Sequence, residues 1–230
     1  MQFPEEYSWP TYDHVVRHIL ATLNPQTILD VGAGAGKYGR MAREVTPQAD
    51  VTAMEIGKDS IERHSLGQIY DRVLELGPSE IIRQQPEAQW DLAILGDVLE
   101  HFPKSEGQDF LNWLDYHARF IVIVVPEALC IHRANWYEGH NSVWTWRDFY
   151  WHDNWAYHTI EQAQLFVLRG YLKSADTLAR LCDSVNNARH QVRQGSSEEV
   201  LTLNHQDGRK VLQRPGPVPG TVTRVWWREP

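Results

Sequence analysis

Cysteine is scarce in this chain, and its two cysteines lie far apart. Cys130 and Cys182 are the only ones among 230 residues. Such a pair provides no disulfide framework of the kind that holds small secreted domains together. It also lacks the clustered thiolates of a structural zinc site. The fold must therefore depend on a hydrophobic core, and a content of 42% hydrophobic residues is enough to form one.

The sequence also lacks a long apolar run. No stretch approaches the ~18 residues that a membrane-spanning helix needs, and the N-terminal residues are acidic and aromatic rather than apolar. These two absences argue against a secretory signal and a membrane span. We therefore expect a cytoplasmic protein with no membrane partner.

Positive charge is in deficit, because 22 Lys and Arg face 30 Asp and Glu, which gives a formal net charge of −8. Proteins that bind nucleic-acid backbones through general electrostatics usually carry a basic surface. A small molecule is therefore a more natural partner for this chain than RNA. Local basic patches are still compatible with the composition.

Strand-like and helix-like segments alternate along most of the chain. We expect strands near 27–31, 51–55, 72–76, 91–96 and 120–125, with helices near 12–23, 37–46, 59–66, 79–85 and 106–117. Two further strands, near 158–163 and 164–169, are expected to close the sheet in antiparallel fashion. This alternation predicts an α/β fold with a mostly parallel sheet, whose ligands bind beyond the carboxyl ends of the strands.

The length suits one main domain with modest additions. We expect an N-terminal lid and first helix over residues 1–24, a core over 25–171, and a C-terminal extension over 172–230. The extension should contain a helix, a hairpin around Asp207-Gly208 and a last strand, at 172–193, 198–213 and 221–229. It is expected to cover the site or to form a homodimer contact.

A glycine-rich turn follows the first strand, in Asp30-Val31-Gly32-Ala33-Gly34-Ala35-Gly36. Glycines let the backbone approach a ligand closely, and the helix that begins near Lys37 directs its free N–H groups toward that ligand. Glu55 stands at the end of the second strand, where an acidic residue accepts hydrogen bonds from ribose hydroxyls. A nucleoside cofactor is the first inference.

The glycine spacing departs from the dinucleotide pattern, and no Gly-x-x-x-x-Gly-Lys-Ser/Thr phosphate loop is present. Residues 30–36 resemble the first motif of class I S-adenosylmethionine-dependent methyltransferases. The resemblance implies a Rossmann-like methyltransferase sheet with an antiparallel closing hairpin, here with a C-terminal helix and β-hairpin extension. It also implies S-adenosylmethionine as the cofactor, with Asp30 at the methionine moiety. The other cofactor contacts that it implies are Gly32, Gly34, Gly36, Tyr38, Glu55, Ile56, Ser79, Gly96 and Asp97.

One position departs from that family. Related enzymes often place an acid after the third strand to bind the adenine amine, but Pro78 stands there in this chain. Ser79, Glu80 or backbone groups are expected to take that role.

A second motif follows the strand at 91–96. Asp97, Glu100 and His101 stand at i, i+3 and i+4, so they share one face if the turn is helical. Carboxylates combined with an imidazole can hold a divalent ion such as Mg²⁺ or Mn²⁺. His140, four residues before Trp144, is a candidate fourth ligand.

These four residues resemble the metal-binding set of small-RNA 3′-terminal 2′-O-methyltransferases. Glu100-His101 is also similar to the corresponding turn of quinone-pathway O-methyltransferases, some of which use a divalent ion. Both groups usually have Glu at the first position, so Asp97 shortens one ligand arm. The alternatives are a metal-free acceptor site, with His101 as general base, and a structural turn. Asp97, Glu100, His101 and His140 are the predicted catalytic residues.

Aromatic residues gather in two places. Residues 3–12 contain four rings, and residues 136–157 contain nine. About half of these rings should be buried in the core. Others in the second group are expected to line an acceptor pocket, and the first group is expected to form the lid over the cofactor.

The expected reaction is transfer of a methyl group from the sulfonium to an oxygen or nitrogen atom of a small molecule. Such a donor is already activated, so the protein mainly aligns the acceptor and removes its proton. One alternative is an RNA 2′-O-methyltransferase, which predicts a basic groove built from Arg133, Arg147, Arg169 and Lys173. Another alternative is a non-catalytic nucleoside-binding partner subunit.

Overall fold

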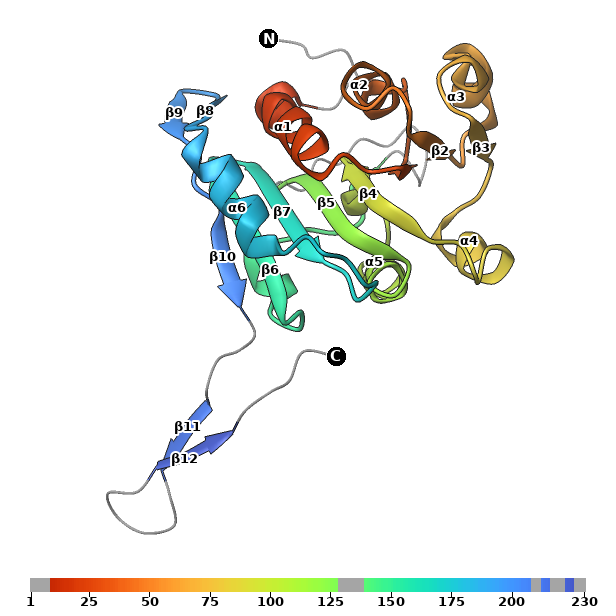
Figure 1. Cartoon of the computed structure of the whole chain (residues 1–230). Coiled ribbons are helices and arrows are strands. Elements are labelled where there is room, and N and C mark those ends of the chain that lie inside the picture. Colours follow the sequence, from red (N-terminus) through yellow and green to blue (C-terminus); the bar gives the residue numbers. More distant parts are fainter. Residues whose placement is uncertain (1–8, 128–138, 208–211, 216–221, 226–230) are drawn as a thin grey trace.

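An eight-stranded sheet forms the centre of the molecule in the computed structural model (Figure 1). The structure describes residues 9–127, 139–207, 212–215 and 222–225. The strand order is β10-β6-β7-β5-β4-β1-β2-β3. The bounds are β1 Thr27–Val31, β2 Asp50–Met54, β3 Arg72–Leu74, β4 Trp90–Gly96, β5 Ala118–Pro126, β6 Asn154–Ile160, β7 Ala163–Arg169 and β10 Asn204–Asp207.

The pairing is parallel from β3 to β5 and antiparallel beyond β5. β1 pairs with β2 and β4, β2 with β3, and β4 with β5, all in parallel. β7 pairs antiparallel with β5 and β6, and β10 pairs antiparallel with β6. The predicted Rossmann-like sheet with an antiparallel closing hairpin is confirmed.

Helices cover both faces of this sheet. Their bounds are α1 Asp13–Leu23, α2 Lys37–Val45, α3 Lys58–Arg63, α4 Pro78–Gln84, α5 Lys104–Leu114 and α6 Leu178–Asn187. Figure 1 shows α1, α2 and α6 on one face and α5 on the other. Four short 3₁₀ helices are η1 Pro10–Tyr12, η2 Leu66–Gln68, η3 Leu99–His101 and η4 Trp146–Phe149.

Alternation along the strands divides the core into two clusters. In β1, Ile28 packs with α1 and α2, whereas Leu29 and Val31 pack with residues of α4 and α5 on the opposite face. Successive side chains of a strand point to opposite faces, so Asp30 shares the face of Ile28. This parity directs the Asp30 carboxyl group toward α2.

The C-terminal extension differs from the prediction in its pairing. The expected hairpin around Asp207-Gly208 is wrong, because β10 adds to β6 at the edge of the main sheet. The Asp-Gly signal is local, whereas the open edge of β6 offers a row of unpaired backbone groups. Two separate hairpins form instead, β8 Gln191–Gln194 with β9 Ser197–Val200 and β11 Leu212–Pro215 with β12 Val222–Val225.

Two expected elements have different bounds. The helix predicted at 172–193 begins only at Leu178, where the Thr177 hydroxyl caps it by accepting a hydrogen bond from the Arg180 N–H. The closing strands begin earlier than predicted and turn at Glu161, which has a positive φ of 46°. Within the described part of the chain, no helix is long and apolar enough to cross a membrane.

Gly39 in α2 provides a test of this packing. A Cβ at Gly39 would lie 2.3 Å from Cζ of Tyr70. Gly39→Ala should therefore lower the free energy of unfolding by about 1–3 kcal/mol, although Ala is the better helix former. Denaturant unfolding measures the change. Gly67→Ala is the control, because no atom lies within 4 Å of a Cβ there; equal stability of the two variants would contradict this packing.

Candidate active site

The glycine loop, residues 32–36, lies at the carboxyl end of β1, and its three glycines have different surroundings. Gly32, Gly34 and Gly36 all have positive φ, at 67°, 50° and 79°. A Cβ at Gly32 would lie 2.3 Å from Val98, and one at Gly36 would lie 2.7 Å from Ile69. At Gly34 the nearest atom would be 3.8 Å away, a carbonyl of the loop itself. Gly34 is therefore the glycine that faces open space.

Glu55 follows β2 and is bound to that loop. Its Oε2 accepts a hydrogen bond from the Gly34 N–H at 2.9 Å, and its Oε1 accepts one from the Gly57 N–H at 2.8 Å. The next side chain, Ile56, is 47% exposed, and its Cδ1 would lie 3.4 Å from a Cβ on Gly77. A carboxylate beside an open glycine, followed by an exposed apolar side chain, provides an acceptor for ribose hydroxyls and a surface for a base.

Asp30 is buried rather than open to the loop. Its Oδ2 accepts a hydrogen bond of 2.5 Å from the Tyr70 hydroxyl, and its Oδ1 has no hydrogen-bond partner among the described residues. Burial raises the pKa of the Asp30 carboxyl group to about 7, although the bond from Tyr70 favours the ionised form. The predicted contact of Asp30 with a methionine moiety stays a prediction.

Tyr38 and Gly96 are interdependent. A Cβ at Gly96 would lie 1.9 Å from Cε2 of the Tyr38 ring, so the ring occupies the space that a side chain at position 96 would need. Burial raises the pKa of the Tyr38 hydroxyl well above its usual range. Nearby carboxylates raise it further, namely those of Asp97, Asp13, Asp30 and Glu100. The Tyr38 hydroxyl is therefore neutral at physiological pH.

Both side chains expected at the adenine already have protein partners. The Ser79 hydroxyl donates to Oε1 of Glu106 at 2.8 Å, and Oε2 of Glu80 accepts from the Gly77 N–H at 2.7 Å. Ser79 is exposed at the start of α4. Ile56 and Gly77 are the neighbouring groups that present an apolar surface, so a role of Ser79 at the adenine stays a prediction.

Asp97 holds the N-terminal segment. Its Oδ2 accepts a hydrogen bond from the Trp9 N–H at 2.9 Å, and the Trp9 carbonyl accepts one from the Lys37 ammonium at 2.9 Å. Lys37 also forms an ion pair of 2.5 Å with Asp13. Residue 9 is therefore tied both to the residue after β4 and to the start of α2, next to the glycine loop. The lid expected over residues 1–24 stays a prediction, since Phe3 and Tyr7 lie outside the described residues.

Three of the four predicted metal ligands converge. One ligand atom from each of Glu100, His101 and His140 lies within 4.8 Å of the others. The rings of His101 and His140 meet edge to face, with centroids 5.1 Å apart. Asp97 does not join this group, and its Oδ2 bonds to Trp9 instead.

Glu100 is the buried member of this group, with 1% of its surface exposed. Its Oε2 has no hydrogen-bond partner among the described residues. Burial raises the pKa of the Glu100 carboxyl group well above its usual range, and the Asp97 carboxylate adds to this effect. An orphaned carboxylate oxygen next to two imidazoles fits a divalent cation. A donor set with two nitrogens suits a transition metal such as Mn²⁺ better than Mg²⁺, which prefers oxygen ligands.

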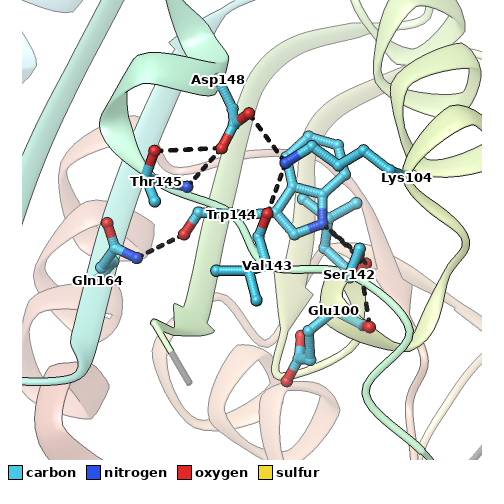
Figure 2. A network of polar contacts seen from close by, with 9 residues as sticks. Glu100, Lys104, Ser142, Val143, Trp144, Thr145, Asp148 and Gln164 are labelled. Carbon is cyan, nitrogen blue, oxygen red and sulfur yellow. Dashed lines mark hydrogen bonds and ion pairs between the residues drawn. The ribbon is translucent and has the colours of Figure 1, made fainter. Parts of the chain in front are cut away.

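The segment that carries His140 is docked on η3 by hydrogen bonds (Figure 2). The Leu99 carbonyl accepts from Trp144 Nε1 at 3.2 Å, and the Glu100 carbonyl accepts from the Asn141 and Ser142 N–H groups at 2.8 and 3.0 Å. The His101 carbonyl accepts from Asn141 Nδ2 at 2.8 Å. All three carbonyls of η3 are therefore satisfied by one segment about 40 positions further along the chain.

Sequence reasoning missed the residues that hold this segment, namely Lys104, Ser142, Asp148 and Gln164. The partners of Lys104, Ser142 and Gln164 lie far away in sequence, so no spacing pattern links them. Two signals were present. Thr145 and Asp148 have the i, i+3 spacing of a capping box, and Gln164 is a fully buried polar residue in the otherwise apolar start of β7.

Comparison with solved structures identifies the architecture. No protein-family model matches the chain, and no curated protein matches it in sequence. An O-methyltransferase family protein from Burkholderia thailandensis superposes with a TM-score of 0.52 at 15% identity, over 71% of this chain and 55% of that one. The methyltransferase domain of bacterial CtHen1 also gives 0.52 at 15% identity, over 70% and 98%. This chain has the class I methyltransferase fold.

A third structure of this fold contains a bound cofactor product. The N-terminal domain of EvdMO1, with S-adenosylhomocysteine bound, superposes with a TM-score of 0.51 at 11% identity, over 70% of this chain and 81% of that one. The glycine loop, Glu55 and Gly96 of this chain all lie at the carboxyl edge of the parallel strands, where a methyltransferase fold binds its ligands.

Most aromatic side chains after β5 belong to the core of the methyltransferase fold. Trp144, Phe149 and Trp155 are buried, and the Trp146 ring stacks on Tyr157 with centroids 6.1 Å apart. Tyr150 and Trp151 are exposed, at 59% and 40%, whereas Trp136 and Tyr137 lie outside the described residues. The aromatic-lined acceptor pocket stays a prediction.

The basic groove expected for an RNA substrate is not assembled by the described residues. Arg169 pairs with Phe120 near the start of β5, and its guanidinium donates to the Arg119 and Leu172 carbonyls. This is the sheet edge opposite to that of the glycine loop. Arg147 lies against its neighbour Trp146, 4.4 Å from the ring centroid, and Arg133 lies outside the described residues.

The buried Asp30 predicts a pH dependence of stability. The folded state keeps the Asp30 proton up to about pH 7, whereas the unfolded state releases it near the ordinary aspartate pKa of 3.8. The folded state therefore binds more protons between these values, and the free energy of unfolding should fall as the pH rises, by at most about 1.4 kcal/mol per pH unit. Asp30→Asn should lack this contribution. Denaturant unfolding of both proteins across this range measures the difference, and parallel curves would contradict the assignment.

Proposed function

We propose that the protein is an S-adenosylmethionine-dependent methyltransferase that acts on an oxygen or nitrogen atom of a small molecule. The observation that carries the proposal is one juxtaposition. Gly34, which is open, and Glu55 lie at the same sheet edge as the group formed by Glu100, His101 and His140. A nucleoside site next to a group that can accept a proton or hold a cation is the arrangement that methyl transfer requires.

The residues of the glycine loop would bind the cofactor. Gly34 allows close approach, Glu55 accepts from the ribose hydroxyls, and Ile56 contacts the base. Tyr38 packs on Gly96 and shapes the floor of the site. S-adenosylmethionine supplies an activated methyl group on a positively charged sulfur.

The second group would activate the acceptor. An imidazole with an ordinary pKa near 6.5 can take a proton from a hydroxyl or an amine at neutral pH. His101 and His140 face each other at this place, and the buried Glu100 carboxyl group lies beside them. Glu100, His101 and His140 would hold a divalent ion, which would supply a Lewis acid that makes an acceptor hydroxyl easier to deprotonate. Without the ion, His101 is the general base.

RNA 2′-O-methylation is the second candidate. It is favoured by the same three-residue group and by the likeness to the CtHen1 methyltransferase domain. The net charge of −8 and the position of Arg169 at the opposite edge favour the small molecule. Binding of RNA that weakens steeply with salt would favour the RNA candidate.

Calorimetric titration with S-adenosylhomocysteine tests the cofactor. The wild type should bind with micromolar affinity, about −8 kcal/mol. Gly34→Ala should weaken binding at least tenfold, about 1.4 kcal/mol, because its Cβ would enter the open space from a backbone with φ of 50°. Gly67→Ala should bind as the wild type does. Failure of the wild type to bind would overturn the proposal.

A Mn²⁺ titration separates the metal-assisted site from the metal-free site. Binding heat that disappears in His140→Ala, and persists in His205→Ala, would place the ion at the three-residue group. His205 is a suitable control because it lies on β10 and contacts Asn154. If the wild type binds S-adenosylhomocysteine but gives no heat with Mn²⁺, His101 acts as general base without a metal.

A further inference from the structure

Lys104 contacts the His140 segment in three ways. It is the first residue of α5, and its ammonium donates to the Val143 carbonyl at 2.6 Å. The same nitrogen forms an ion pair of 2.9 Å with Oδ1 of Asp148 and lies 3.7 Å from the centroid of the Trp144 ring. One side chain therefore holds the backbone, a ring and a carboxylate of the segment that follows His140.

Asp148 connects this cation to the start of η4. Its Oδ2 accepts from the Thr145 N–H at 2.7 Å and from the Thr145 hydroxyl at 3.2 Å, as part of a capping box. The two oxygens of one carboxylate thus bind Lys104 and cap the next helix. The segment is fixed on its C-terminal side by the same group that neutralises Lys104.

Gln164 holds the segment from the sheet. It is fully buried in β7, opposite Val125 near the carboxyl end of β5, and its Nε2 donates to the Trp144 carbonyl at 2.6 Å. Figure 2 shows Trp144 with Lys104 on one side and Gln164 on the other. We call Lys104, Asp148 and Gln164 the Trp144 clamp.

The clamp acts close to the residues of the candidate site. Lys104 stands three positions after His101, and Val143, which it contacts, stands three positions after His140. A bond between Lys104 and Val143 therefore joins the two short segments that carry the converging side chains. The carbonyls of η3 connect the same two segments further, because they accept hydrogen bonds from Asn141, Ser142 and Trp144.

We propose that Lys104, Asp148 and Gln164 are positioning residues, which hold His140 against His101 and Glu100 and thereby set the geometry of the acceptor site. The interpretation of this place as the acceptor site rests on the proposed function, whereas the clamp itself is tested without it. A purely structural role is the competing explanation. The Lys104 side chain is 41% exposed, and ion pairs at exposed positions contribute little to global stability. The effect of Lys104 should therefore be local.

Lys104→Met is the test, because it keeps the aliphatic stem over Trp144 and removes the ammonium. The readout is the nuclear Overhauser effect between the imidazole protons of His101 and His140, whose ring centroids are 5.1 Å apart. His140→Gln identifies the His140 resonances. The effect should be present in the wild type, lost in Lys104→Met and restored in Lys104→Arg. Lys58→Met is the matched control, because Lys58 is also an exposed first residue of a helix.

Two further measurements separate the outcomes. The dissociation constant for S-adenosylhomocysteine should change less than twofold in Lys104→Met, since the glycine loop does not contact the clamp. If the wild type binds Mn²⁺, its affinity should fall at least tenfold in the same variant. An unchanged ring-to-ring effect in Lys104→Met would overturn the clamp. Absence of S-adenosylhomocysteine binding in every protein, with the ring effect lost only in Lys104→Met, would overturn the proposed function and leave the clamp standing.

Discussion

The parallel pairing of β1 with both β2 and β4 is the constraint on which the site depends. It places the glycine loop, Glu55 and Gly96 at one edge, although they come from three separate strand ends. β5 pairs with β4 in the same direction, so the end of β5 at Pro126 lies at this edge as well. The register of the strands fixes the position at which each loop begins. It therefore also determines which loops lie next to one another at this edge.

Buried carboxyl groups are the second theme of this edge. Asp30 and Glu100 are each 1% exposed, and each has an oxygen without a hydrogen-bond partner in the described part of the chain. Keeping such groups ionised in a poorly solvated place is costly, which is why burial raises their pKa values. Proteins usually retain groups of this kind where a cation or a proton is to be held. Burial likewise raises the pKa of the Tyr38 hydroxyl well above its usual range.

The sequence was sufficient for the local part of this architecture. Hydrophobic periodicity located β1 and α2, and the glycine spacing between them predicted the loop. The turn signal in Asp207-Gly208 led to a wrong hairpin prediction. β10 pairs instead with the open edge of β6, which lies far away in sequence. The spacing alone placed Asp97 on one face with Glu100. However, η3 begins only at Leu99, so Asp97 precedes this helix, and its carboxylate accepts a hydrogen bond from the Trp9 N–H instead. Contacts such as Gln164 to Trp144 depend on how the chain returns to the sheet, which no local pattern encodes.

The attachment of Trp9 has a consequence for how this protein tolerates change. Both hydrogen bonds that hold residue 9 use its main chain, the N–H to Asp97 and the carbonyl to Lys37. Every amino acid except proline offers the same two groups. The side chain at position 9 contributes only through its packing against the hydrophobic core, so another large apolar residue can take its place during evolution. The number of residues between position 9 and α1 cannot change, because a single insertion or deletion would move a different peptide unit past Asp97 and Lys37.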